Sequence, residues 1–211
     1  MPEQTRKLAA IVFTDIVGFT KLTAEDQQKA SDLLDLQRSE LKPLVESHGG
    51  KWVKEVGDGL ILTFDTITNA VQCCLKIQDK ARSIENLSLR IGVHLGEILV
   101  KEGDIIGDDV NITARIEPFS APGGIAISNK VNDALVREAN FTTKYLGKPQ
   151  LKGVGQEVKV YCITSHGLPE TKLSDVSAKL EKKSNWYIYV VSAAAVVLVA
   201  GFILLNPFGE E

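Results

Sequence analysis

The sequence predicts an α+β fold whose elements begin in the order β-α-β-β-α-β, a ferredoxin-like arrangement. Short apolar runs bounded by glycine or charged residues alternate with two longer segments in which apolar residues recur every three or four positions. The stretch 1–164 is long enough for one hydrophobic core. We therefore expect one domain over 1–164, followed by a polar linker at 165–185.

The first strand and the first helix follow from local patterns. The apolar run Leu8–Phe13 is short and flanked by charge, which is typical of a buried strand. A helix is predicted over 23–48, with Thr23 as its N-cap, Gly49-Gly50 as its end and a late kink at Pro43. Its apolar positions form one stripe: Ala30, Leu33, Leu34, Leu41, Leu44 and Val45.

A β-hairpin and a second helix come next. The runs Lys51–Val56 and Leu60–Phe64 are strand-like and enclose Gly57-Asp58-Gly59, which is typical of a tight turn. The second helix is predicted over about Thr68–Arg82. Four further strands are expected: Leu89–Val93, Ile125–Ser128, Thr142–Leu146 and Val158–Ile163.

Two aspartates lie at the ends of predicted strands. Asp15 comes just past the first strand, and Asp58 lies in the turn of the hairpin. Carboxylates on neighbouring strand ends could hold a hard cation such as Mg²⁺. Each residue also has an ordinary structural interpretation, because aspartate is common after strands and in glycine-flanked turns.

Three segments carry a resemblance to a known family. They are Phe13-Thr14-Asp15-Ile16-Val17-Gly18-Phe19-Thr20, Val56-Gly57-Asp58-Gly59 and the run from Asp104 to Arg115. In residue types and spacing they resemble the catalytic motifs of class III adenylyl/guanylyl cyclases, and the similarity extends over residues 7–164. The resemblance implies the α+β class III cyclase fold and the cyclisation of a nucleoside triphosphate.

The resemblance implies a metal site. Asp15 and Asp58 match the family's metal ligands, and the backbone carbonyl of Ile16 matches a further ligand. Two cations per active site, Mg²⁺ or Mn²⁺, are therefore expected. Two such ions about 3.5–4 Å apart favour attack by the ribose hydroxyl and shield the triphosphate.

Lys54 and Asp104 match the pair that recognises the purine base. A lysine ammonium can donate to N1 of adenine, and an aspartate can accept from its exocyclic amine. Guanine inverts both requirements, and each mismatch of a buried polar group costs about 1–3 kcal/mol. The pair therefore favours ATP over GTP. An exposed strand lysine and a turn aspartate are the ordinary interpretations of the two residues.

Asn111 and Arg115 match positions that orient the ribose and stabilise the transition state. They are four residues apart, so on a helix they share a face, and the arginine fork suits phosphate oxygens. The local pattern is ambiguous, however, because the apolar residues here alternate. Asn111 could be an ordinary polar helix residue, and Arg115 could pair with Glu117 or Asp108.

Two further residues and one short segment also bear on the expected site. Lys152, in a predicted late hairpin, matches a lysine that binds the terminal phosphates, although lysines also occur at turns for solubility. His94 lies in an apolar strand and is interpreted as a hydrogen-bonded core residue. The short arm 95–103 lacks the arginine that some family members carry, and Lys101 is its only candidate substitute.

Family members act as dimers with sites shared across the interface, and this chain carries both sets of residues. The resemblance thus implies a homodimer in which Asp15 and Asp58 come from one chain and the base- and phosphate-binding residues come from its partner. We expect an adenylate cyclase that makes 3′,5′-cyclic AMP and pyrophosphate. A guanylate cyclase and an inactive nucleotide-binding module are the alternatives. A diguanylate cyclase is not expected, because Val56-Gly57-Asp58-Gly59 does not match the Gly-Gly-Asp/Glu-Glu-Phe signature of those enzymes.

Residues 186–205 carry no charge, and twenty helical residues at 1.5 Å each span the ~30 Å core of a bilayer. Lys179, Lys182 and Lys183 precede this segment, and Glu210 and Glu211 follow it. The positive-inside bias predicts a single-pass C-terminal anchor in the cell (inner) membrane, a cytoplasmic catalytic domain and a short non-cytoplasmic tail at 206–211.

Composition excludes some classes of function. A net charge of −3 argues against a nucleic-acid-binding surface. The cysteines Cys73, Cys74 and Cys162 have neither the spacing of a zinc site nor that of a disulfide framework, which fits a reducing compartment.

Overall fold

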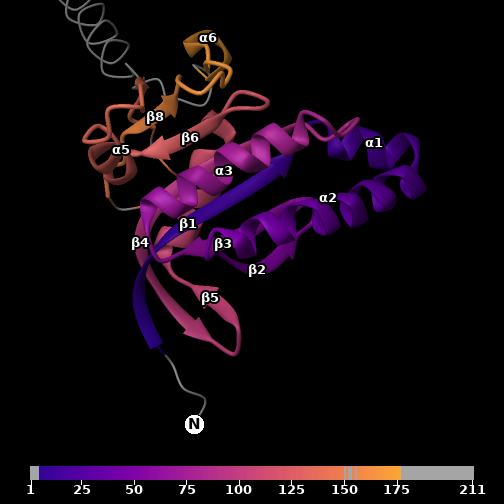
Figure 1. The fold of residues 1–211 in the computed structure, drawn as a ribbon, viewed down its shortest axis with the longest axis horizontal. Coiled ribbons are helices and arrows are strands. Elements are labelled where there is room, and N and C mark those ends of the chain that lie inside the picture. Colours follow the sequence, from indigo (N-terminus) through magenta and orange to yellow (C-terminus); the bar gives the residue numbers. More distant parts are fainter. Residues whose placement is uncertain (1–4, 150, 152–153, 155, 177–211) are drawn as a thin grey trace, which may run out of the picture. The chain divides into compact units, whose positions relative to one another are not determined.

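The order β-α-β-β-α-β is confirmed by the computed structural model, which describes residues 5–149, 151, 154 and 156–176 (Figure 1). The strands pair in the order β2-β3-β1-β4-β6-β8-β7, and β5 pairs with β4. Their bounds are β1 (Thr5–Ile16), β2 (Lys51–Val56), β3 (Gly59–Phe64), β4 (Leu89–Lys101), β5 (Asp104–Ile106), β6 (Ile125–Ser128), β7 (Thr143–Gly147) and β8 (Val160–Ile163).

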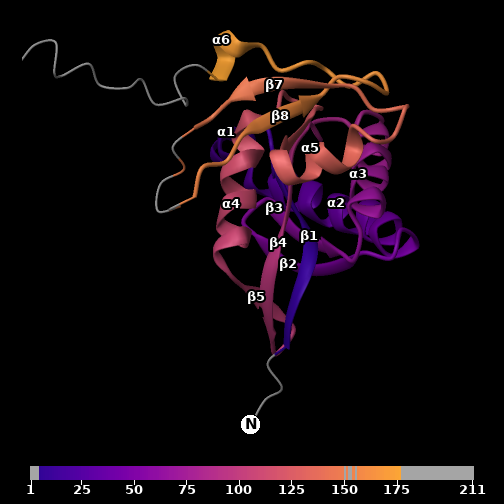
Figure 2. The ribbon, with the colours of Figure 1, turned by 90° about the vertical axis from the view of Figure 1, so that its left-hand side faces the viewer.

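Helices cover both faces of the sheet (Figures 1 and 2). The long helices α2 (Gln27–Ser47) and α3 (Ile67–Ala81) lie on one side, and α4 (Asp108–Ile116) lies on the other (Figure 2). The remaining helical elements are α1 (Phe19–Glu25), the 3₁₀ turn η1 (Glu117–Phe119), α5 (Asn129–Leu135) and α6 (Leu173–Val176).

Strand β1 lies inside the sheet, between β3 and β4, and its middle residues are buried on both faces. Ala10 and Val12 belong to the core beneath α2 and α3, a side that we call the helix face. Ala9 and Ile11 belong to a second core with Ile105 of β5, a side that we call the β5 face. Alternate residues of β1 therefore feed two different cores, as the period of two in a strand requires.

The helix predicted over 23–48 is two helices, so this prediction was wrong in its start. Thr23 lies inside α1, where its hydroxyl donates to the carbonyl of Phe19 at 3.0 Å. The chain is extended at Asp26, with φ of −155°, and the Asp26 carboxylate accepts a hydrogen bond from the amide of Lys29. Asp26 caps α2 more effectively than an upstream threonine could, because it sits where the backbone breaks.

The end of that helix is as predicted. Helix α2 runs through Pro43 to Ser47. Gly49 follows with φ of +70°, a left-handed conformation that glycine adopts without strain. The Gly49-Gly50 stop is therefore confirmed.

The arm at 95–103 is regular structure rather than a loop. Strand β4 does not end at Val93 as predicted but continues to Lys101, paired with β1 from Ile16↔Leu89 to Thr5↔Val100. A two-residue turn then leads into β5, with φ of 52° at Glu102 and 84° at Gly103. Positive φ at both positions is the pattern of a type I′ hairpin.

The ambiguous segment around Asn111 is helical. In α4 the buried residues are Ile112, Thr113 and Ile116, which lie on one side of a helix. The apparent alternation of apolar residues was misleading because Val110 faces a different cluster, the core on the β5 face.

The first part of the segment predicted as a linker packs on the domain. Thr171 is buried, donates through its hydroxyl to the carbonyl of Phe119 and accepts from the amide of Ala121. Within the described part of the chain no helix is long and apolar enough to cross a membrane, and the predicted span 186–205 lies outside the described residues.

Candidate active site

Asp15 and Asp58 lie together at one edge of the sheet. Asp15 is the penultimate residue of β1, slightly inside the strand rather than past its end, and Asp58 is in the two-residue turn between β2 and β3. The Asp58 carboxylate accepts a hydrogen bond from the amide of Ile16 at 2.9 Å. The turn is tight because Gly57 has φ of +62°.

The turn is pressed against β1. A Cβ at Gly59 would lie 2.7 Å from the carbonyl oxygen of Thr14, so only glycine allows this approach. The Thr14 hydroxyl, which is buried, accepts from the amide of Leu60 at 3.2 Å. These contacts fix the turn, and with it the Asp58 carboxylate, beside the end of β1.

The two carboxylates are close enough for their negative charges to repel each other. Burial and the neighbouring Asp58 raise the pKa of Asp15 to about 6, and Arg90 opposes this by lowering it. Asp15 is thus poised to hold either a proton or a cation. Without a metal ion, a proton on Asp15 relieves the repulsion between the two carboxylates. A bound divalent ion would relieve the same repulsion.

These residues fit a metal ion that is completed by other ligands. Within the described residues there is no group of three or more histidine, cysteine or acidic side chains that could hold a metal. The Asp15–Asp58 pair supplies two carboxylates, and Mg²⁺ commonly takes only one or two from the protein and the rest from water and phosphate. The chemistry of the donor set therefore suits a cation bound together with a triphosphate.

Arg90 is a residue that the sequence analysis missed. It is the direct partner of Asp15 in the β1–β4 ladder, and its guanidinium lies 3.9 Å from the Asp15 carboxylate. It brings positive charge to the same edge of the sheet. A lone arginine in the predicted strand 89–93 was the available signal, but only the register of β4 against β1 reveals what it faces.

Lys54 and Asp104 meet in the structure although 50 residues separate them. The Lys54 ammonium lies 2.6 Å and 2.7 Å from the two carboxylate oxygens of Asp104. This hydrogen bond, and a second one from the amide of Ile105, lower the pKa of Asp104. The two residues predicted to recognise the base are thus brought together, with the carboxylate ionised and both groups partly exposed.

Asn111 and Arg115 lie one turn apart on α4. Asn111 is exposed and Arg115 is half-buried, whereas the neighbouring Ile112 is buried. Both side chains therefore come from the accessible side of a helix whose other side is fixed in the core. Lys152 lies outside the described residues, so its expected role stays a prediction.

His94 is a core residue, as predicted. It is 2% exposed, and its Nε2 lies 2.9 Å from a carboxylate oxygen of Asp109. Burial lowers the pKa of His94. The Asp109 carboxylate also accepts from the amide of Glu97, so it ties the first turn of α4 to β4 and steadies the helix that carries Asn111.

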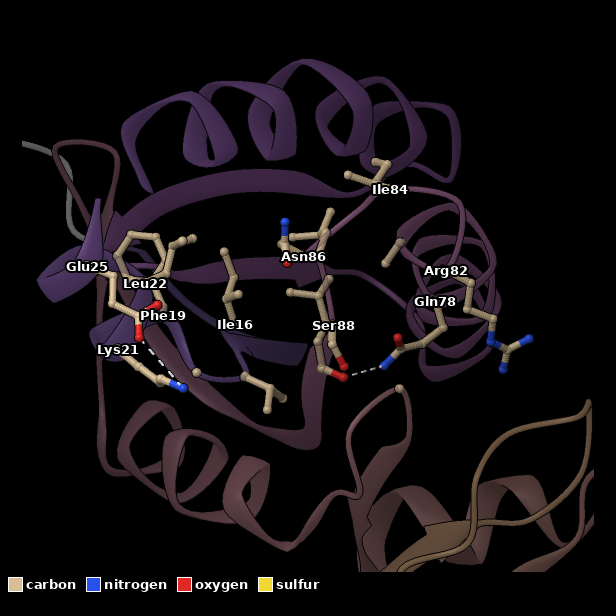
Figure 3. Close-up of a pocket in the computed structure, with 16 residues that line it drawn as sticks. Ile16, Phe19, Lys21, Leu22, Glu25, Gln78, Arg82, Ile84, Asn86 and Ser88 are labelled. Atoms are coloured by element: carbon tan, nitrogen blue, oxygen red, sulfur yellow. Dashed lines mark hydrogen bonds and ion pairs between the residues drawn. The ribbon is translucent and has the colours of Figure 1, made fainter. Parts of the chain in front are cut away.

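A cavity of about 530 Å³ lies beside the end of β1, where Ile16 lines it (Figure 3). Phe19 and Leu22 of α1 line it on one side, and Gln78 of α3 lines it on another. Ile16 contributes to its wall, but neither Asp15 nor Asp58 does. The cavity is therefore adjacent to the candidate site without containing its charged groups.

Within one protomer the carboxylate pair and the Lys54–Asp104 pair make separate sets of polar contacts. In the described part of the chain no hydrogen bond or ion pair joins Asp15 or Asp58 to Lys54, Asp104 or the α4 residues. Both groups nevertheless face the same side of the sheet. Asp15 shares a face of β1 with Ile11 and Phe13 of the β5 face, because side chains two residues apart in a strand point the same way. Lys54 is paired with Ile61 of that face.

A comparison with known families identifies the domain. Residues 1–165 match the adenylate and guanylate cyclase catalytic domain. The chain belongs to this family. The cyclase domain accounts for most of the described residues, and its sheet, hairpin turn and α4 are the elements that carry the candidate site.

Relatives of the cyclase domain include bacterial proteins named as adenylate cyclases. A protein of Rhizobium meliloti strain 1021, provisionally named adenylate cyclase 3, is 34% identical over 164 residues, covering 74% of this chain and 28% of that protein. The adenylate cyclase of Streptomyces coelicolor is 26% identical over 137 residues, covering 64% of this chain and 36% of that protein. The chain thus spans about a third of the length of these relatives.

Solved cyclase structures share the fold. An adenylate/guanylate cyclase/hydrolase from Silicibacter pomeroyi is 30% identical with a TM-score of 0.72, and the match covers 80% of this chain and all of that one. The adenylyl cyclase CyaB from P. aeruginosa is 25% identical with a TM-score of 0.67, and the match covers 77% and 96% of the two chains. The α+β cyclase fold is confirmed.

We predict that Asp58→Asn lowers the pKa of Asp15 from about 6 toward its ordinary value of 3.8, because it removes a like charge. Between these pH values the folded chain binds more protons at Asp15 than the unfolded chain does, so this residue makes folding less favourable as the pH rises. The variant should therefore gain more stability at pH 7 than at pH 4. Carboxyl NMR titration and urea unfolding at both pH values measure the two effects.

Asp65→Asn is the matched control, because Asp65 is an exposed carboxylate that follows β3 and pairs with Lys7. It should leave the pKa of Asp15 unchanged. An Asp15 that titrates identically in the parent protein and in Asp58→Asn would contradict the proposed coupling.

Proposed function

We propose that this chain is a membrane-anchored adenylate cyclase that converts ATP to 3′,5′-cyclic AMP and pyrophosphate at the interface of a homodimer. The observation that carries the proposal is the Lys54–Asp104 pair, held at 2.6–2.7 Å in a cyclase domain that also keeps Asp15 and Asp58 side by side. The names of the relatives support the same reaction.

The carboxylate edge is the proposed site of the triphosphate. Asp15, Asp58 and the carbonyl of Ile16 would hold two Mg²⁺ or Mn²⁺ ions, which would favour deprotonation of the ribose hydroxyl and neutralise charge on the departing pyrophosphate. Arg90 adds a fixed positive charge 3.9 Å from Asp15. Its fork of donors suits phosphate oxygens that approach the same edge.

The Lys54–Asp104 pair is the proposed base-binding site. In the absence of a nucleotide the two groups satisfy each other, so neither is left as an unpaired charge. An adenine could enter between them, because it accepts at N1 and donates from its exocyclic amine. A guanine would present a donor to the lysine and an acceptor to the carboxylate, which is repulsive at both positions.

Helix α4 supplies the proposed groups for the reacting centre. Asn111 would orient the ribose through its amide, and Arg115 would stabilise the charge that develops on the phosphate oxygens as pyrophosphate leaves. Lys152 would contact the terminal phosphates. Asn111 and Arg115 lie on a helix that is packed into the core, which would keep both side chains in place during the reaction.

A symmetric dimer would join the two halves of the site. Helices α2 and α3 lie on the helix face, whereas the residues proposed to bind the metal ions and the base lie on the β5 face. A two-fold axis passing through this face would bring the carboxylates of one chain to the Lys54–Asp104 pair of its partner, and the reverse, giving two equivalent sites.

The proposed anchor is residues 186–205, with the catalytic domain on the cytoplasmic side of the cell (inner) membrane. Support comes from the sequence, namely an uncharged span of twenty residues preceded by lysines and followed by glutamates.

Replacing Val197 and Leu198 with lysine should release the full chain from lipid vesicles in a flotation assay. A charge at the centre of a span costs about 2.5–3.5 kcal/mol per residue on the insertion scale. Replacing the same two residues with alanine is the matched control and should leave the chain bound. Equal flotation of the lysine and alanine variants would rule out the anchor.

The purified full chain, given ATP or GTP with Mg²⁺ or Mn²⁺, should form cyclic AMP in preference to cyclic GMP. Lys54→Met should lower the ratio of kcat/KM for ATP to that for GTP by about tenfold or more, because a hydrogen bond from a charged group contributes about 1.5 kcal/mol or more. Product identified by mass decides the substrate. Preferential formation of cyclic GMP would favour a guanylate cyclase, and absence of either product would favour a nucleotide-binding module.

Asp58→Ala and Asn111→Ala should each abolish turnover, whereas a mixture of the two variants should recover activity. A heterodimer of these chains has one site with both defects and one site with neither, so mixing equal amounts should restore about a quarter of the parent rate if chains pair at random. Circular dichroism checks that each variant is folded. Failure of folded variants to complement would contradict a shared site.

A further inference from the structure

Strand β2 has an irregularity directly before Lys54. Trp52 is the partner of Leu62 on β3, and Lys54 is the partner of Ile61, so Val53 has no partner of its own. One extra residue on one strand of an antiparallel pair is a β-bulge.

The bulge decides which way Lys54 faces. Residues directly opposite each other in a ladder share a face of the sheet. Trp52 therefore lies with Leu62 on the helix face, and Lys54 lies with Ile61 on the β5 face. In a regular strand Trp52 and Lys54 would share one face, because side chains alternate with a period of two. The extra residue thus turns Lys54 toward Asp104.

A side-chain network on the helix face joins the residues on either side of the bulge. Glu55 accepts from the indole of Trp52 at 3.2 Å. The same carboxylate receives two hydrogen bonds from Arg38 of α2, at 2.7 Å and 2.6 Å, in the parallel geometry of an arginine fork. Trp52 and Glu55 flank the Val53-Lys54 step, so the network holds β2 to α2 across the bulge.

We propose that Arg38 and Glu55 are positioning residues that set the base selectivity of the enzyme, by locking the bulge that presents Lys54 to Asp104. The inference rests on the proposed role of Lys54 in base recognition. Neither residue is placed to touch the nucleotide; both lie on the helix face, and Lys54 lies on the β5 face. They act through the backbone of β2, which connects Glu55 directly to Lys54.

The expected effect is moderate because the Arg38–Glu55 ion pair, which we call the clamp, is partly exposed. The side chains of Arg38 and Glu55 are 45% and 30% exposed, and ion pairs of this kind contribute modestly. Loss of the clamp should therefore change selectivity by about threefold to fivefold, which is less than the loss of Lys54 itself. The effect should appear mainly in KM for ATP, since the groups at the reacting phosphate are untouched.

The test measures kcat/KM for ATP and GTP in Arg38→Met and Glu55→Gln. Each variant should lower the ATP:GTP ratio by about threefold to fivefold, and the double variant should lower it no further than either single one. Arg38→Lys should lie in between, because lysine keeps the charge but loses the fork.

The chain offers two matched controls, one on α2 and one on α3. Asp35→Asn removes the other carboxylate bound to Arg38, at 2.7 Å, without touching β2. Lys80→Met breaks the 2.5 Å ion pair between Glu40 of α2 and Lys80 of α3. Both variants remove a comparable exposed pair and should keep the parent ATP:GTP ratio.

A second readout does not depend on turnover. The hydrogen bond from Lys54 lowers the pKa of Asp104, so a displaced Lys54 should let that pKa rise. Carboxyl NMR titration of Asp104 should show this rise in Lys54→Met, and a smaller one in Arg38→Met and Glu55→Gln. Asp35→Asn should leave it unchanged.

The outcomes separate the two proposals. If Lys54→Met leaves the ATP:GTP ratio unchanged, base recognition by Lys54 fails, and the selectivity role fails with it. If Lys54→Met lowers the ratio but Arg38→Met and Glu55→Gln do not, the positioning role is overturned while the proposed function stands. An equal loss of rate with both nucleotides, with the Asp104 pKa unshifted, would also overturn it, because that pattern indicates general destabilisation.

Discussion

The register of β1 between β3 and β4 is the constraint on which the rest of the site depends. It sets Asp15 opposite Arg90 and brings the end of β1 to the turn that carries Asp58. A slip of one residue would turn Asp15 to the helix face and exchange the side chains that β1 sends into its two cores. Because Ala9 to Val12 are fully buried, such a slip would cost apolar burial on both faces, and the register is strongly fixed.

The two halves of the site have opposite electrostatic characters. At the carboxylate edge, burial and the nearby negative charge of Asp58 together raise the pKa of Asp15. At the proposed base site Lys54 and Asp104 neutralise each other, and the hydrogen bond from Lys54 lowers the pKa of Asp104. The first half needs a cation to be satisfied, whereas the second can exchange one partner for another. This difference suits a protein that binds a charged triphosphate at one place and an uncharged base at the other.

Local patterns predicted the order of the elements well, because the spacing of apolar residues within a short segment distinguishes a strand from a helix. The β2–β3 hairpin, the Gly49-Gly50 stop and the buried His94 are confirmed. Errors arose at the boundaries of elements. The helix expected over 23–48 breaks at Asp26, and the arm 95–103 is strand because β1 and β5 pair with it. Lys152 and 186–205 lie outside the described residues, so those predictions stand as they were.

The sequence by itself determined which chemical groups are present: carboxylates beside glycines, a lysine four residues before Asp58, and a helix face with Asn111 and Arg115. Only the tertiary structure decided what these groups face. The pairing of Asp15 with Arg90, and the bulge that turns Lys54 toward Asp104, depend on register between strands far apart in the chain. Register is set by the simultaneous packing of two cores, and no local window of sequence contains that information.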